Sequence, residues 1–139
     1  MKIDIIHMHK PSLLTGTIFA FLSVIIGAFG AHYLKTIFTT ELLISFETGV
    51  RYQMYHALAL IFTGVLATKW SSKKANILYL LFTAGILLFS GSIYILCLLK
   101  ANGTIGITGL GMLTPIGGIC FLAAWFYFFI LLLRSDYIA

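Results

Sequence analysis

The stretch Phe46-Glu-Thr-Gly-Val-Arg51-Tyr-Gln-Met-Tyr-His56-Ala-Leu-Ala-Leu60 decides how the rest of the chain is interpreted. It opens an apolar segment that continues to Thr68, and nowhere else do several polar and ionisable residues enter such a segment. Ionisable residues inside a membrane are costly, face the interior of a bundle and usually have partners. We therefore predict that one face of this segment forms the interior of a helical bundle.

The composition indicates that lipid surrounds most of the chain. Of the 139 residues, 60% are hydrophobic and 9% are charged, whereas soluble domains carry about a quarter charged residues. Four apolar segments approach the roughly 20 residues that a helix needs to cross a membrane, and the alternating pattern of a membrane barrel is absent. We predict an all-α membrane protein, a four-transmembrane-helix bundle with short loops in a single domain. This domain covers residues 1–139, with spans at about 13–35, 45–69, 75–99 and 110–134.

The basic residues serve to predict topology. The net charge is +5, but the basic residues lie at helix ends rather than on one face, which disfavours a nucleic-acid partner. If the N-terminus is cytoplasmic, the cytoplasmic side carries Lys2, Lys10, Lys69, Lys73, Lys74 and Arg134. The opposite side carries Lys35, Arg51 and Lys100. The positive-inside rule then predicts that both termini are cytoplasmic.

The histidines and cysteines outside the central stretch give little support for a metal or cofactor. His7 and His9 are two residues apart with no third ligand nearby, so we expect a solvated tail at the lipid headgroups. Cys97 and Cys120 both fall inside apolar spans, and we expect small buried apolar side chains rather than a disulfide or a metal site. No cofactor is expected.

Small residues mark the positions where helices are expected to approach closely. Gly27 and Ala31 are four residues apart on the first span, and Gly30 widens the same face. Gly117 and Gly118 repeat the pattern on the last span. The predicted helix-packing positions are Gly27, Gly30, Ala31, Gly91, Pro115, Gly117 and Gly118.

The start of the last span has two interpretations. Thr114-Pro115 matches an N-cap followed by proline at the first helical position. The helix then starts at Pro115, and residues 105–113 enter the membrane as a re-entrant segment shielded by neighbouring helices. Alternatively, a helix begins at about Gly109 and kinks near the proline. Both interpretations remain open at this point.

A depth calculation brings polar residues of all four spans together. With a cytoplasmic N-terminus and a rise of ~1.5 Å per residue, each span delivers polar or small side chains to the outer half of the bilayer. The predicted polar cluster consists of His32, Thr48, Tyr52, Gln53, His56, Ser92, Tyr94 and Thr114. We expect these side chains to form hydrogen bonds between helices. The alternatives are a titrating histidine in a transport path, a ligand pocket, or a haem held between His32 and His56.

Two charged residues lie beside this face. Glu47 and Arg51 are four residues apart with the acid first, which is the favourable order for an ion pair on a helix. We predict a local ion pair at the level of the outer headgroups.

Four ordered motifs resemble a known family. They are Gly27-Ala-Phe-Gly-Ala-His32, Tyr52-Gln-x-x-His56-x-Leu-Ala, Gly91-Ser-Ile-Tyr94, and Thr114-Pro-Ile-Gly-Gly118 followed by Trp125. Together they resemble the small membrane family called domain of unknown function 423, which has bacterial inner-membrane members and small eukaryotic transmembrane relatives. The resemblance implies a four-helix integral membrane protein of the bacterial inner membrane. Its motifs include the polar cluster and Pro115, but Glu47, Arg51 and Ala124 depart from them.

The functional expectation is correspondingly general. No paired carboxylates, metal-ligand set or nucleophile–base pair is visible, so we do not expect an enzyme. We expect a structural or accessory membrane component that contacts lipids and forms a homo-oligomer or part of a larger membrane complex. The alternative is a small transporter or channel-like protein that binds an ion, a proton, a small molecule or a lipid at His32, Gln53 and His56.

Overall fold

The computed structural model describes residues 8–103 and 108–134, and within these ranges all regular secondary structure is helical, without strands. Among the described residues, three helical stretches are long and apolar enough to cross a membrane: Lys10–Thr36, Ser72–Ala101 and Gly109–Leu133. The elements in order are α1 (Lys10–His32), η2 (Leu34–Thr36), α2 (Thr40–Leu66), η3 (Ala67–Lys69), α3 (Ser72–Gly85), η4 (Ile86–Ser90), α4 (Gly91–Ala101), α5 (Thr108–Gly111) and α6 (Leu113–Leu133).

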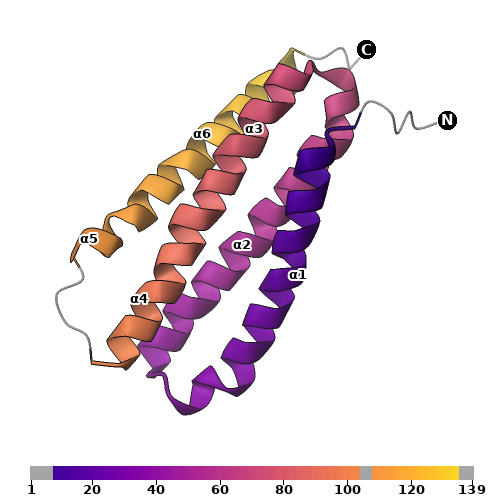
Figure 1. The fold of residues 1–139 in the computed structure, drawn as a ribbon. Helices are drawn as coiled ribbons and strands as arrows, with labels where there is room; N and C mark the ends of the chain where they lie inside the picture. The colour runs from indigo at the N-terminus through magenta and orange to yellow at the C-terminus, as the bar shows by residue number, and fades with distance from the viewer. Residues whose placement is uncertain (1–7, 104–107, 135–139) are drawn as a thin grey trace.

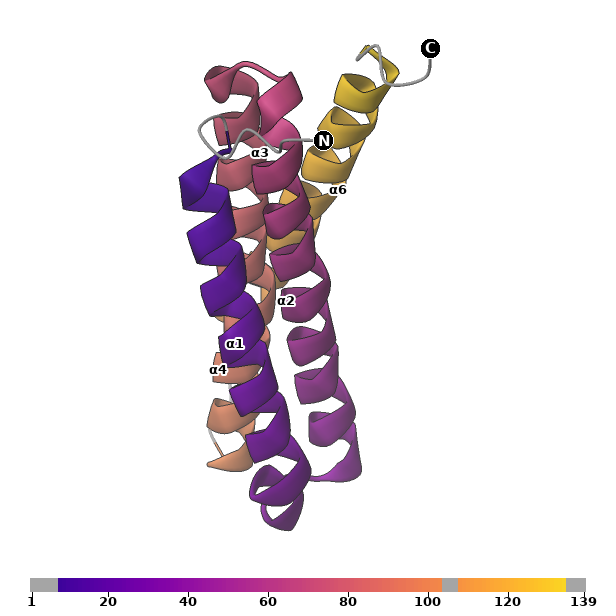
Figure 2. The same ribbon diagram turned by 90° about the vertical axis from the view of Figure 1, so that its right-hand side faces the viewer.

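The long helices form an elongated bundle of two antiparallel hairpins (Figure 1). One hairpin is α1 packed on α2, and the other is the α3–η4–α4 stretch packed against α6. The start of α1 and the end of α6 lie at the same end of the bundle (Figure 1). Towards that end, α6 leans away from the other helices (Figure 2). The main backbone contacts of α6 within the described residues are therefore with α3 and η4.

The helix α2 is the central element, although it is not among the three most apolar stretches. Thr39 caps its N-terminus by accepting a hydrogen bond from the Leu42 backbone N–H at 3.4 Å. The backbone N–H of Glu41 and the Thr39 hydroxyl hold the pKa of the Glu41 carboxyl below its usual value. Glycine lets α1 approach α2 closely, because a Cβ at Gly16 would lie 2.7 Å from the carbonyl oxygen of Ala57.

The predicted small-residue contacts on α1 lie partly where expected. A Cβ on Gly30 would meet the Phe46 ring at 3.0 Å, and one on Gly27 would meet Val50 at 3.2 Å. Ala31 differs from the prediction because it is exposed. It lies on the outer side of α1, since α2 covers the face that carries Gly30.

The third long helix contains a feature that the sequence pattern did not indicate. Between α3 and α4 the hydrogen bonding widens into one π-helical segment, η4. Such segments are rare and often lie at functional sites. Here η4 carries Phe89, whose ring stacks on Tyr52 of α2 at a centroid distance of 4.7 Å and lies 5.6 Å from Phe121 of α6. Phe89 therefore occupies the space between α2 and α6.

The start of the last span follows the second interpretation more closely. Residues 108–111 are helical, the helix is interrupted at Met112, and α6 begins at Leu113. The Thr114 cap of the first interpretation is not formed, because Met112 occupies the N-cap position of α6. The Thr114 hydroxyl lies 2.6 Å from Ser92 Oγ on α4 instead. Pro115 occupies the first turn of α6, where its missing N–H costs no helical hydrogen bond. The part of the re-entrant interpretation that concerns residues 104–107 lies outside the described residues.

Candidate functional site

Gln53 connects three helices. Its Nε2 donates to the carbonyl oxygen of Phe19 on α1 at 2.9 Å, and its Oε1 accepts a hydrogen bond from the Tyr94 hydroxyl of α4, also at 2.9 Å. Ser23 Oγ of α1 donates a second hydrogen bond between these helices, to the Val50 carbonyl oxygen of α2 at 2.9 Å. Bonds of this kind within a membrane contribute roughly 0.5–1 kcal/mol each. Both ends of the buried amide are therefore used to hold helices together.

His56 uses both ring nitrogens as well. Nδ1 lies 2.7 Å from the carbonyl oxygen of Tyr52, and Nε2 lies 3.1 Å from Nε1 of Trp125 on α6. An indole N–H can only donate and a carbonyl can only accept. Nε2 is therefore the acceptor and Nδ1 carries the proton, which makes His56 a neutral imidazole.

Aromatic rings enclose this histidine. The imidazole stacks on Phe121 with a centroid distance of 3.4 Å and an interplanar angle of 6°, and the Phe82 ring centroid is 5.8 Å away. Only 5% of the His56 surface remains exposed. The His56–Trp125 hydrogen bond thus lies in apolar surroundings, where a lost hydrogen bond leaves a costly unpaired group.

A further pair of hydroxyl groups joins α4 to α6. Ser92 Oγ donates to the carbonyl oxygen of Phe89 at 2.9 Å and shares a hydrogen bond of 2.6 Å with Thr114 Oγ1. This pair lies directly after the π-helical segment. It secures the first turn of α6 beside Phe89, where Gly117 brings the α6 backbone against the Phe89 backbone nitrogen.

A groove of about 680 Å³ runs between α2 and α6. Phe89 of η4 lines the groove between these two helices. The side chains of His56 and Phe121, which are largely buried, also line it. The rim is open, with Tyr52 40% exposed and Leu122 71% exposed. The lining residues are Tyr52, Tyr55, His56, Phe89, Pro115, Gly118, Ile119, Phe121, Leu122 and Trp125.

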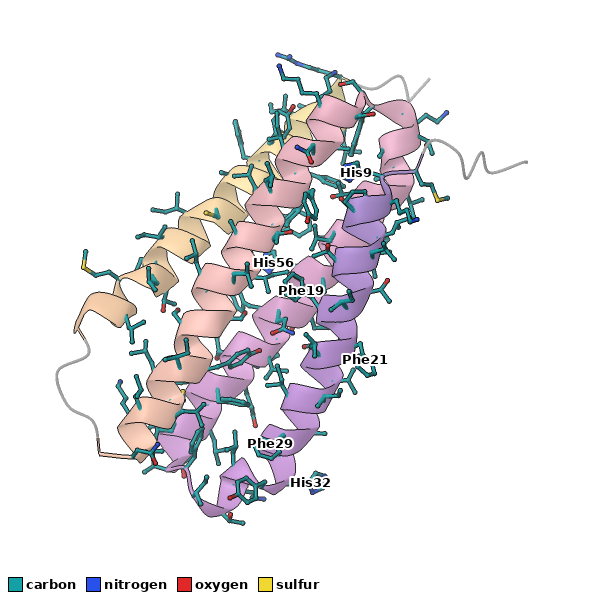
Figure 3. The ribbon with its side chains drawn as sticks, in the orientation of Figure 1. His9, Phe19, Phe21, Phe29, His32 and His56 are labelled. Carbon is teal, nitrogen blue, oxygen red and sulfur yellow. The ribbon has the colours of Figure 1, made fainter. Side chains whose placement is uncertain are left out.

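The structure separates His32 from the rest of the predicted polar cluster. His32 is exposed and points away from the bundle near one end, whereas His56 lies near mid-length (Figure 3). The reason is the antiparallel register of the two helices. Gly30 packs on Phe46, and Phe46 precedes His56 by about 15 Å of helix. A haem held between His32 and His56 is therefore ruled out by the geometry.

The other predicted cluster residues divide into separate contacts. Gln53 meets Tyr94, Ser92 meets Thr114, and His56 bonds to the Tyr52 carbonyl. Thr48 donates to the Ile44 carbonyl at 2.9 Å, within its own helix.

The predicted Glu47–Arg51 ion pair is not formed within the part of the chain that the structure describes. Arg51 Nη2 instead donates to Thr48 Oγ1 at 3.4 Å. Both charged side chains are exposed, where an ion pair gains little over hydration.

Three further predicted packing positions differ from expectation. Gly91 has open space where a side chain would lie, with no atom within 4 Å of an added Cβ. Pro115 is exposed and lines the groove rather than an inter-helix contact. Gly118 also lines the groove, with only Phe89 at 4.0 Å from an added Cβ.

Sequence reasoning missed Trp125, Phe121 and Ser23 as members of the site. Trp125 ended one of the quoted motifs, which was the only signal for it. Spacing within one helix cannot show that Trp125 faces His56, because that pairing depends on the register between α2 and α6. Ser23 had a weaker signal, as a hydroxyl near the middle of the first apolar span.

Comparison with known proteins agrees with this membrane fold. The profile described as "Protein of unknown function (DUF423)" matches residues 26–118. The UPF0382 membrane protein YwdK of Bacillus subtilis is 42% identical over 118 residues, which cover 84% of this chain and 90% of YwdK. The UPF0382 membrane protein SH2409 of Staphylococcus haemolyticus is 40% identical over 116 residues, covering 84% of this chain and 89% of its own.

A third relative comes from Haemophilus influenzae. A UPF0382 membrane protein of Haemophilus influenzae is 38% identical over 105 residues, covering 76% of this chain and 79% of that protein. No solved structure matches the chain. These similarities span most of the helical bundle, and the chain belongs to the DUF423 family of membrane proteins.

Proposed function

We propose that this protein is a non-enzymatic accessory component of the bacterial inner membrane, and that its working surface is the groove between α2 and α6. The observation that supports this most directly is that the buried polar side chains of α2 already have hydrogen-bond partners, whereas none of the described helices covers the groove surface. Gln53 and His56 are committed to hydrogen bonds between helices. The groove, by contrast, is open at the side of the bundle and offers a surface for an apolar partner.

We propose four membrane spans, which are the three long apolar stretches described above and α2. The polar face of α2 is shielded from lipid because α1, α3, η4 and α4 all pack against it. An even number of spans agrees with the start of α1 and the end of α6 lying at one end of the bundle (Figure 1). Lys73, Lys74 and Arg134 gather at that end, which favours a cytoplasmic location for both termini.

The transport alternative has less support. It relied on His32, Gln53 and His56 acting together, but His32 is exposed at the far end of α1. A titrating histidine needs a nitrogen that can exchange protons with a path, and both His56 nitrogens are hydrogen-bonded inside an aromatic enclosure. The accessory function therefore remains the better proposal.

A comparison of two glycine variants tests the proposal. Gly118→Leu fills the groove, whereas Gly91→Leu places the same side chain in open space away from it. Each variant and the wild type would be purified gently from the native membrane, and the co-purifying proteins and lipids identified by mass spectrometry. We expect Gly118→Leu alone to lose specific companions. An identical set in all three samples would refute the groove as the working surface.

A further inference from the structure

The walls of the α2–α6 groove are unusually rich in rings. Of the ten lining residues, six carry a ring with a π face: Tyr52, Tyr55, His56, Phe89, Phe121 and Trp125. They come from three different elements, so the rings surround one space rather than following one helix. Aromatic side chains interact favourably with other rings through offset or edge-on contacts. The groove therefore matches a flat ring better than a flexible chain.

The polar character of the groove selects among such rings. None of the ten described lining residues is charged, which disfavours an ionised ligand at this depth. His56 contributes no free hydrogen-bonding group, because its nitrogens are bonded to Tyr52 and Trp125.

The remaining polar groups lie at the rim. Tyr52 and Tyr55 are 40% and 56% exposed, and neither hydroxyl forms a hydrogen bond among residues 8–103 and 108–134. An unpaired hydroxyl in hydrocarbon is unfavourable. A ligand carbonyl or hydroxyl would therefore be stabilised at this rim.

The dimensions and position fit a molecule that arrives through the lipid. A volume of about 680 Å³ lies within the roughly 300–1,000 Å³ typical of ligand pockets. The α6 wall runs from Pro115 to Trp125, about 15 Å along the helix. Gly118 leaves the middle of this wall without a side chain. The exposed rim residues Ile119 and Leu122 would face hydrocarbon, so a lipid-soluble ligand needs no aqueous entrance.

Together these features define a ligand class. We propose that the groove binds the ring of a neutral, lipid-soluble quinone, with the ring among the aromatic side chains, a ring oxygen at the hydroxyl of Tyr52, whose own ring lies beside Phe89 and Phe121, and the tail directed into the bilayer. This inference rests on the proposed function, since it names the apolar partner of the same groove.

Tryptophan fluorescence provides the test, because a bound quinone quenches an adjacent indole. The chain has two tryptophans, so a Trp70→Phe background leaves Trp125 in the groove as the only reporter. The purified protein in phospholipid nanodiscs would be titrated with a decyl-substituted benzoquinone. The same titration would be made after adding Gly118→Leu, Gly91→Leu or Tyr52→Phe to this background. Thermal unfolding would verify that each variant is folded.

We expect saturable quenching in the background protein and with Gly91→Leu, and roughly tenfold weaker binding with Gly118→Leu. Tyr52→Phe keeps the ring and the fold, and it should weaken binding several-fold. Linear, non-saturable quenching that is equal in all proteins would overturn the inference. Displacement of the quinone by dodecanol as readily as by a second ring-bearing quinone would also overturn it, in favour of an acyl chain.

This test can fail separately from the proposed function. If Gly118→Leu changes the set of companions from the native membrane but no quinone binds saturably, the ligand class is wrong and the working surface stands. If the companions do not change, the proposed function fails whatever the titration shows.

Discussion

Replacing Gly117 by alanine should destabilise the bundle, whereas the same replacement at the adjacent Gly118 should not. A Cβ at Gly117 would collide with the backbone nitrogen of Phe89 and lie 2.9 Å from its Cα. A Cβ at Gly118 would meet only the Phe89 ring, at an ordinary contact distance of 4.0 Å. The two variants therefore have the same chemistry, helix and depth, and differ only in what the new methyl group touches.

The magnitude follows from two opposing effects. Alanine is favoured over glycine in a helix by roughly 1 kcal/mol, and this gain applies to both positions. Overpacking a close contact typically costs about 1–3 kcal/mol. At Gly117 the obstacle is backbone rather than a flexible side chain, so we expect a cost near the upper limit. Gly117→Ala should lower the free energy of unfolding by about 1–2 kcal/mol, and Gly118→Ala should raise it slightly.

Thermal unfolding in one detergent, followed by far-ultraviolet circular dichroism, would measure both variants against the wild type. Gly91→Ala is the matched control, because an added Cβ there meets no atom within 4 Å, and it should behave like Gly118→Ala. Equal stability of the Gly117 and Gly118 variants would show that α6 does not approach Phe89 as closely as the structure has it.

Three further measurements address the polar contacts. A double-mutant cycle of Gln53→Leu and Tyr94→Phe should give a coupling free energy of about 0.5–1 kcal/mol. A coupling near zero would show that the Tyr94–Gln53 hydrogen bond does not stabilise the protein. Trp125→Phe leaves Nε2 of His56 unpaired and should destabilise the protein by about 1–3 kcal/mol in the same unfolding assay, whereas retained stability would contradict the bond. Burial lowers the pKa of His9 from its usual 6.5, so the unfolded chain binds the proton first as the pH falls. The stability that neutral His9 contributes is present above pH 6.5 and is lost as the pH falls through the lower folded-state pKa. His9→Gln should therefore remove that part of the pH dependence of the melting temperature.

The sequence predicted the helices and the segment that carries the buried polar residues, because hydropathy and helix-end residues act locally. It also identified Gln53 and His56 as the polar residues that enter the central helix. It misjudged His32, because depth was counted from expected span ends, and the actual register is set by Gly30 packing on Phe46. Contacts between two helices depend on how each helix is rotated about its axis and how far it is shifted along its neighbour. Neither quantity can be predicted from the sequence of one helix alone.

Two local features were not settled by the sequence pattern. The helix is interrupted at Met112, and Thr114, the N-cap in one of the two interpretations, bonds through its hydroxyl to Ser92 on another helix. The π-helical segment that carries Phe89 has no distinctive composition, since its residues Ile86-Leu-Leu-Phe-Ser90 would fit an ordinary apolar helix. In both cases a tertiary contact accompanies a local geometry that propensity did not indicate.

The existence of the groove follows from how narrowly α6 packs. Its buried residues recur at intervals of four and three, which is the narrow seam of a coiled coil rather than a broad apolar face. They are Gly117, Phe121, Ala124, Phe128 and Leu131. Because this seam faces α3 and η4, the neighbouring stripe with Gly118, Leu122 and Trp125 remains uncovered and becomes the wall of the groove. Almost every residue of α6 is apolar, so lipid can cover any face of this helix. What distinguishes this stripe is that its tryptophan is bonded to a buried histidine of α2, which holds the two walls of the groove together.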